Sequence, residues 1–122
     1  MPPARSKWIA LFGAILLIAT AVASLIPAHM QIRTGLHWQV EHFLVYFVAT
    51  SIFCLVWPRP FIVAGVMVAF SALLEALQGL TPDRTPDLPT ALSAAAGALT
   101  AGVLAWLVIR LRKLALARAK QI

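Results

Sequence analysis

The residues of this sequence best suited to chemistry are a few polar side chains set within long apolar stretches. Ser71, Glu75 and Gln78 are spaced four and three residues apart, which places them on one face of a helix. His42 and Tyr46 are one helical turn apart on an earlier stretch. A carboxylate and an imidazole can transfer protons, whereas phenol and amide groups can orient a polar ligand. If the two faces meet, we expect Glu75 to accept a proton or a hydrogen bond there.

Two further candidates follow in the short segment after the third apolar stretch. Arg84 is suited to pairing with an anion or with Glu75. Asp87 either joins the same cluster or caps the next helix, which would have Pro89 in its first turn. The predicted polar pocket therefore comprises His42, Tyr46, Glu75, Gln78, Arg84 and Asp87. An alternative stays open, in which these groups satisfy one another and only hold the helix ends together.

The composition indicates that lipid surrounds most of the chain. Of the 122 residues, 61% are hydrophobic and 11% charged, whereas soluble domains are roughly half apolar and a quarter charged. Four apolar runs cover about residues 8–26, 38–57, 61–80 and 90–109, each close to the roughly 20 residues that cross a bilayer. Backbone polar groups must pair internally in lipid, which favours helices. We therefore predict one all-α domain over residues 1–122, a four-helix transmembrane bundle.

The basic residues predict the orientation of this bundle. Eight of the ten flank the spans on the side of the two termini, and only Arg33 and Arg84 lie on the other side. Because cytoplasmic loops carry the excess of basic residues, both termini are predicted to be cytoplasmic. The tail 110–122 is expected to extend the fourth helix and attract anionic lipid headgroups. The first run also resembles a cleavable signal peptide, and cleavage would leave three spans and an outside N-terminus.

Several other classes of function have little support in the sequence. The chain has no phosphate-binding loop, nucleophile elbow or glycine-rich fingerprint, and we expect neither a cofactor nor a nucleic-acid partner. We expect no metal site, because His37, Glu41 and His42 do not form a zinc-binding pattern on one helix face. Cys54, the only cysteine, is expected to be a packing residue.

Small residues predict close helix packing in the fourth span. Ala94, Ala98 and Gly102 form a row at spacing four, with Ser93, Gly97 and Ala101 beside it. Such rows let helix backbones approach closely in lipid.

The polar residues resemble the signature of the VanZ-like family over essentially the whole chain. Residues 41–47 are similar to its H-x-x-x-Y segment, and residues 74–78, followed by Arg84, Asp87 and Gly97, are similar to its E-x-x-Q…R-x-x-D…G pattern. The resemblance implies a four-span protein of the bacterial cell envelope, located in the inner membrane. The family's namesake is linked to low-level resistance to the glycopeptide teicoplanin.

The sequence also departs from the family pattern. The family often has Asp-Lys before the histidine and a second Asp and an Asn after the arginine loop. This chain has Trp38-Gln39 and, later, Thr90 and Ala94 at those places.

The leading hypothesis is that an outward-facing polar pocket recognises a lipid-linked glycan or a lipid headgroup. Three alternatives are a small membrane enzyme that uses His42 or Glu75 for proton transfer, a proton-coupled transporter and a structural partner subunit. The sequence favours binding over catalysis and leaves the oligomeric state open.

Overall fold

Four helices make up the described part of the fold. The computed structural model describes residues 3–25, 38–80 and 88–121. Within these ranges the helices are α1 (Pro3–Leu25), α2 (Trp38–Val56), α3 (Pro60–Gln78) and α4 (Leu88–Gln121). All four are long and apolar enough to span a membrane. The predicted all-α fold, with four helices long and apolar enough to span a membrane, is therefore confirmed for the described residues.

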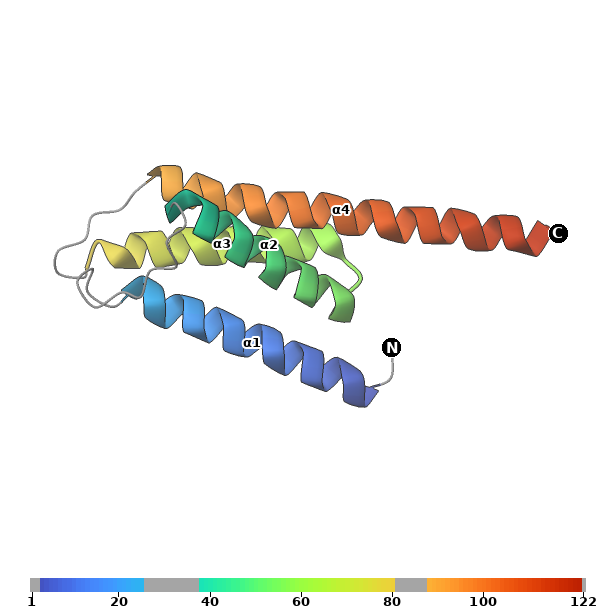
Figure 1. Ribbon diagram of the computed structural model, residues 1–122, viewed down its shortest axis with the longest axis horizontal. Helices are drawn as coiled ribbons and strands as arrows, with labels where there is room; N and C mark the ends of the chain where they lie inside the picture. The colour runs from blue at the N-terminus through green and yellow to red at the C-terminus, as the bar shows by residue number, and fades with distance from the viewer. Residues whose placement is uncertain (1–2, 26–37, 81–87, 122) are drawn as a thin grey trace.

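The helices alternate in direction along the chain, so that both termini lie at the same end of the bundle (Figure 1). We call this end the terminal end; the turn between α2 and α3 also lies here. The start of α2, the end of α3 and the start of α4 lie at the opposite end, which we call the distal end (Figure 1). The fold thus separates the eight basic residues of the described segments, all near the terminal end, from Glu41 and Glu75 at the distal end.

Helix α3 begins at a proline and ends just before a glycine. Pro60 is its first residue and Arg59 its N-cap, as expected because proline lacks the N–H group that a first helical turn leaves unpaired. The helix ends at Gln78 rather than at the predicted residue 80. The N–H groups of Gly79 and Leu80 donate hydrogen bonds to carbonyl groups only three residues back, so the backbone tightens into a turn after Gln78. The apolar run extends to Leu80, but the helix does not.

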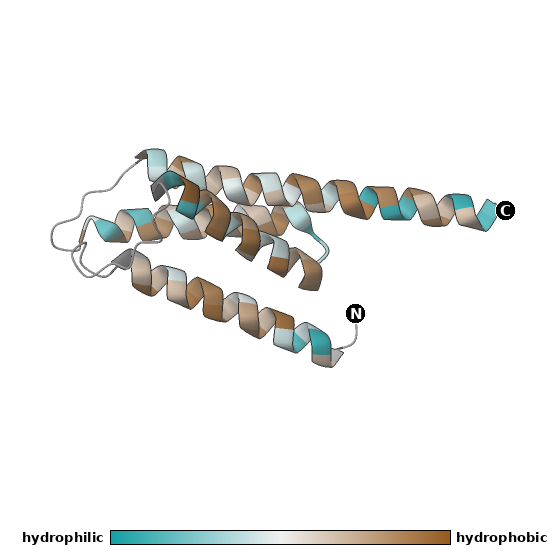
Figure 2. Cartoon of the chain, viewed as in Figure 1, coloured by the Kyte–Doolittle hydropathy of each residue, from teal (hydrophilic) through white to brown (hydrophobic). Residues whose placement is uncertain are grey.

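Helix α4 is much longer than its neighbours and projects beyond them at the terminal end (Figure 1). Its 34 residues correspond to about 51 Å at about 1.5 Å per residue, against roughly 30 Å for a hydrocarbon core. Figure 2 shows hydrophilic residues among the apolar ones in its last turns. The prediction that the basic tail continues the fourth helix is confirmed through Gln121.

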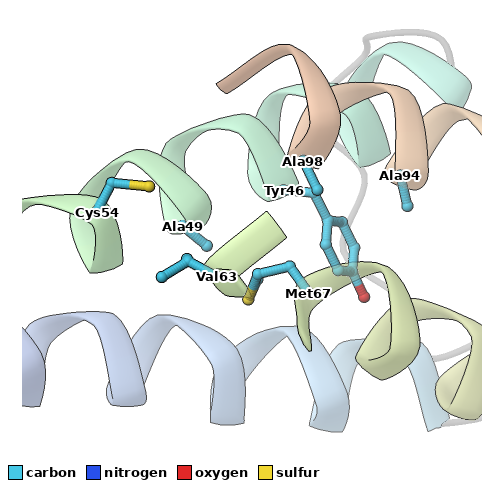
Figure 3. Packing of buried hydrophobic residues seen from close by; sticks show 7 residues of the cluster. All are labelled: Tyr46, Ala49, Cys54, Val63, Met67, Ala94 and Ala98. Atoms are coloured by element: carbon cyan, nitrogen blue, oxygen red, sulfur yellow. The ribbon is translucent and has the colours of Figure 1, made fainter. Parts of the chain in front are cut away.

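The core lies among α2, α3 and α4, and α4 contacts both other helices extensively. Figure 3 shows the central residues, which are mostly small or flexible: Tyr46, Ala49 and Cys54 from α2, Val63 and Met67 from α3, and Ala94 and Ala98 from α4. Cys54 is therefore a packing residue, as predicted.

The small residues of α4 are the points where the backbones come closest. A β-carbon on Gly97 would overlap the carbonyl oxygen of Phe43 in α2, and one on Gly102 would lie 2.9 Å from the β-carbon of Ala64 in α3. The close-packing prediction for α4 is confirmed at these two glycines.

Helix α1 packs on the outside of this three-helix core. It contacts α2 and α3, and Gly13 is its only buried residue between Ala4 and Ala23. Gly13 lies against the side chains of Phe53 and Ile52. Most of the α1 surface is therefore available to lipid.

Candidate polar pocket

The distal end holds a small pocket lined by polar side chains from three helices. Helix α2 contributes His42 and Tyr46, α3 contributes Ser71, Leu74, Glu75 and Gln78, and α4 contributes Thr90, Ala91 and Ala94. The structure thus brings together four of the six predicted pocket residues, and the two predicted helix faces meet.

Tyr46 forms the inner wall on the α2 side. It is 2% exposed, and its ring packs against that of Phe70 with centroids 6.3 Å apart. Figure 3 shows its hydroxyl directed away from α2 toward α3, where it interacts electrostatically with Glu75. The ring anchors the residue in the core while its oxygen faces the pocket.

Helix α3 presents its polar face at the same place. Ser71 and Gln78 are buried, at 6% and 5% exposure, and Glu75 between them is partly exposed. The Ser71 hydroxyl donates a hydrogen bond to the carbonyl oxygen of Val68, 3.1 Å away. Glu75 lies one helical turn before the end of α3 at Gln78. Glu75 therefore lies near the distal end of the bundle.

Thr90 is a polar pocket residue on α4 that was not among the six predicted. It is 1% exposed and closes the pocket from α4, with Ala94 one turn further along. Thr90 and Ala94 are also two of the positions at which the chain departs from the VanZ-like pattern that it resembles, with Thr and Ala in place of Asp and Asn. That departure is the only sequence signal that pointed to position 90, and no pocket role was predicted from it.

The pocket is small. The space left between its side chains is about 10 Å³, close to the roughly 10–15 Å³ that one water molecule requires. It can hold a water molecule, a hydroxyl group or a proton shared between side chains. A complete sugar or phosphate group would have to remain at its mouth.

Two predicted pocket residues, Arg84 and Asp87, lie outside the described residues, as does His37. Glu41 is partly exposed in the first turn of α2 and does not line the pocket. Within residues 3–25, 38–80 and 88–121, no three His, Cys, Asp or Glu side chains come together as potential metal ligands.

Comparison with protein-family models, with curated proteins and with solved structures finds no match to this chain. The class of this protein comes from its fold and its site alone. The described residues form four apolar helices long enough to span a membrane, as in a multi-pass membrane protein, with a polar pocket at one end. The VanZ-like assignment stays a prediction.

Proposed function

We propose that this chain is a VanZ-like protein of the bacterial inner membrane whose pocket binds the hydroxyl-rich headgroup of an envelope lipid, such as a lipid-linked glycan. One observation carries the proposal: the polar side chains of His42, Tyr46, Ser71, Glu75, Gln78 and Thr90 converge from three helices on one small space. Ionisable and polar groups are costly inside a membrane, and they mark functional sites there.

The chemistry of the described pocket suits a sugar hydroxyl better than an isolated phosphate. Glu75 supplies carboxylate oxygens that accept hydrogen bonds, and the amide of Gln78 can both donate and accept. Among the described residues, no Lys or Arg lines the pocket. Arg84, outside the described residues, keeps its predicted role of pairing with an anionic group of the same headgroup.

The size of the pocket determines how such a headgroup would bind. Because the pocket has room for about one water molecule, one hydroxyl would enter it and displace that water. The rest of the headgroup would lie at the mouth, beyond the ends of the helices. A site of this kind selects a ligand by a single well-placed polar group rather than by enclosing it.

The proposed orientation places the pocket on the outer side of the membrane and both termini in the cytoplasm. Eight basic residues of the described segments lie toward the terminal end, and such an excess marks the cytoplasmic side of membrane proteins. Trp8, Trp57 and Trp106 lie near the same end and are at least one-third exposed, as expected for residues that anchor a helix at the membrane interface.

A binding measurement on the purified protein tests this function. The probe is a polyprenyl diphosphate that carries a disaccharide, and the reference is the same carrier lipid without sugar. We expect the protein to bind the probe more tightly than the reference. Glu75→Gln should weaken binding of the probe by about tenfold, because a hydrogen bond to a charged group is lost.

Glu41→Gln is the matched control, because it removes an acidic residue of the same end that does not line the pocket. Equal binding of the probe by wild type, Glu75→Gln and Glu41→Gln would overturn the proposal. Loss of folded protein in Glu75→Gln, with unchanged probe affinity in the fraction that remains folded, would instead support the structural-subunit alternative.

A cellular test addresses the relation to glycopeptides. We expect expression of the chain in a teicoplanin-sensitive bacterium to raise the teicoplanin concentration that stops growth, and Glu75→Gln to remove this effect at equal membrane levels. Unchanged sensitivity with wild-type protein would contradict this part of the proposal.

A further inference from the structure

A second cavity, unrelated to the polar pocket, opens at the terminal end between the second half of α2 and the middle of α4. Its volume is about 620 Å³, within the range of roughly 300–1,000 Å³ that is typical of ligand sites. The walls are mostly apolar and include Cys54, Leu55, Ala101, Leu104 and Val108, with Arg112 at one end. We call this cavity the terminal groove.

The groove exists because α1 does not cover this side of the core. Among the described residues, α1 contacts α2 and α3 but not α4. Only its start reaches the groove, through Ser6. Leu55 and Val108 are more than half exposed, so the groove opens onto the lipid-facing surface of the bundle.

The length of the groove matches one leaflet of a bilayer. Along α4 it extends from Ala101 to Arg112, eleven residues that rise about 16 Å at about 1.5 Å per residue. Half of a hydrocarbon core is roughly 15 Å. Since α4 becomes basic from Arg110 onward, we expect Arg112 at headgroup level and Ala101 near the middle of the bilayer.

The charge around the mouth of the groove has one sign. Arg112 lines it, and Arg5, Lys7, Arg110 and Lys113 lie at the same end of the bundle. The two acidic residues that the structure describes are at the distal end. A hydrophobic channel of leaflet length with a cationic mouth is complementary to a lipid with an apolar chain and an anionic head.

We propose that the terminal groove is a binding site for an anionic phospholipid of the leaflet at the terminal end. One acyl chain lies along Leu104 and Val108, and the lipid phosphate pairs with the guanidinium group of Arg112. The acyl chain of the lipid fills a space in which the side chains of the groove wall would otherwise lack contacts. The lipid phosphate accepts a charge-assisted hydrogen bond from Arg112. This site is independent of the ligand proposed for the polar pocket.

Native mass spectrometry of the detergent-solubilised full chain tests this site. The probes are phosphatidylglycerol and phosphatidylcholine with identical acyl chains, offered in equal amounts. We expect the wild type to retain one phosphatidylglycerol in preference to phosphatidylcholine. Arg112→Gln should reduce this preference by about fivefold, the effect of one basic residue at a lipid surface.

Arg118→Gln is the matched control for charge, because it removes one basic residue of the same helix outside the groove. It should leave the preference for phosphatidylglycerol unchanged. If Arg118→Gln and Arg112→Gln lower the preference equally, the attraction comes from the whole basic tail and the proposed site is wrong. Equal retention of the two lipids by the wild type would also overturn it.

A second pair of variants tests the place of the acyl chain. Val108→Trp puts a large ring into the groove and should displace the retained lipid. Leu107→Trp places the same ring on the neighbouring residue, which is 40% exposed and does not line the groove, and should retain the lipid. Retention of the lipid in Val108→Trp, with a thermal unfolding temperature like that of Leu107→Trp, would place the lipid elsewhere and overturn the proposal.

Discussion

Gly97 of α4 lies directly against the backbone of Phe43 in α2. A β-carbon at position 97 would overlap the Phe43 carbonyl oxygen and would lie only 3.0 Å from the carbonyl carbon. This approach fixes the rotation and depth of α2 against α4. Because Phe43 follows His42 and Gly97 lies one turn from Ala94, the contact also positions two walls of the polar pocket.

Gly97→Ala is expected to destabilise the fold, because the obstacle is backbone and cannot rotate away. Overpacking of this kind costs about 1–3 kcal/mol. Thermal unfolding of the detergent-solubilised protein, followed by circular dichroism, measures the effect. The control is Gly65→Ala, where a β-carbon would meet nothing within 4 Å and where alanine, the better helix former, should leave stability unchanged or raise it by up to about 1 kcal/mol. Equal unfolding temperatures for the two variants would contradict the close α2–α4 contact.

Thr50→Val is expected to leave stability unchanged or raise it slightly. Thr50 is fully buried, and its hydroxyl oxygen has no hydrogen-bond partner among the described residues. Replacing the hydroxyl with a methyl group of similar size therefore removes a desolvation cost that can reach about 1–3 kcal/mol. Thr90→Val is the comparison, since Thr90 is equally buried but lines the polar pocket. In the same thermal unfolding measurement, Thr50→Val should have a higher unfolding temperature than Thr90→Val. A lower unfolding temperature for Thr50→Val would contradict this account.

Tyr46→Phe separates the role of the ring from that of the hydroxyl. The buried ring and its contact with Phe70 remain, so the protein should stay folded, while the hydroxyl group that lines the pocket is lost. We expect probe binding to weaken by roughly threefold to tenfold, as for the loss of one hydrogen bond of about 1 kcal/mol. Tyr46→Ala should instead unfold the protein, because removing a buried aromatic ring costs about 3–5 kcal/mol. Unchanged affinity in Tyr46→Phe would exclude the hydroxyl from ligand binding.

The topology is testable with reporter fusions. A reporter that is active only in the cytoplasm should be active when fused after Ile122 and inactive when inserted next to Leu80. The basic residues at the terminal end are the physical reason, since they are retained on the cytoplasmic side. Activity at Leu80 with none after Ile122 would place the polar pocket on the inner side and contradict the proposed orientation.

The sequence by itself determined that there are four long helices among the described residues and approximately where most of them begin and end. Apolar runs of bilayer length require helices whatever their neighbours are, and Pro58 and Pro60 mark the α2–α3 turn because proline ends or begins a helix. Helical periodicity likewise placed Ser71, Glu75 and Gln78 on one face of α3. These are local properties that follow from the order of residues along one segment.

Only the tertiary structure decided what that face meets. The rotation of each helix about its axis depends on contacts with other helices, here the close approaches at Gly97 and Gly102. Hydropathy alone does not set this rotation, because lipid tails are as apolar as the helix surfaces. Those contacts bring His42 and Tyr46 to Glu75 and add Thr90. They also reduce the pocket to the size of one water molecule. Helix α1 contacts α2 and α3 but not α4, which leaves the terminal groove open.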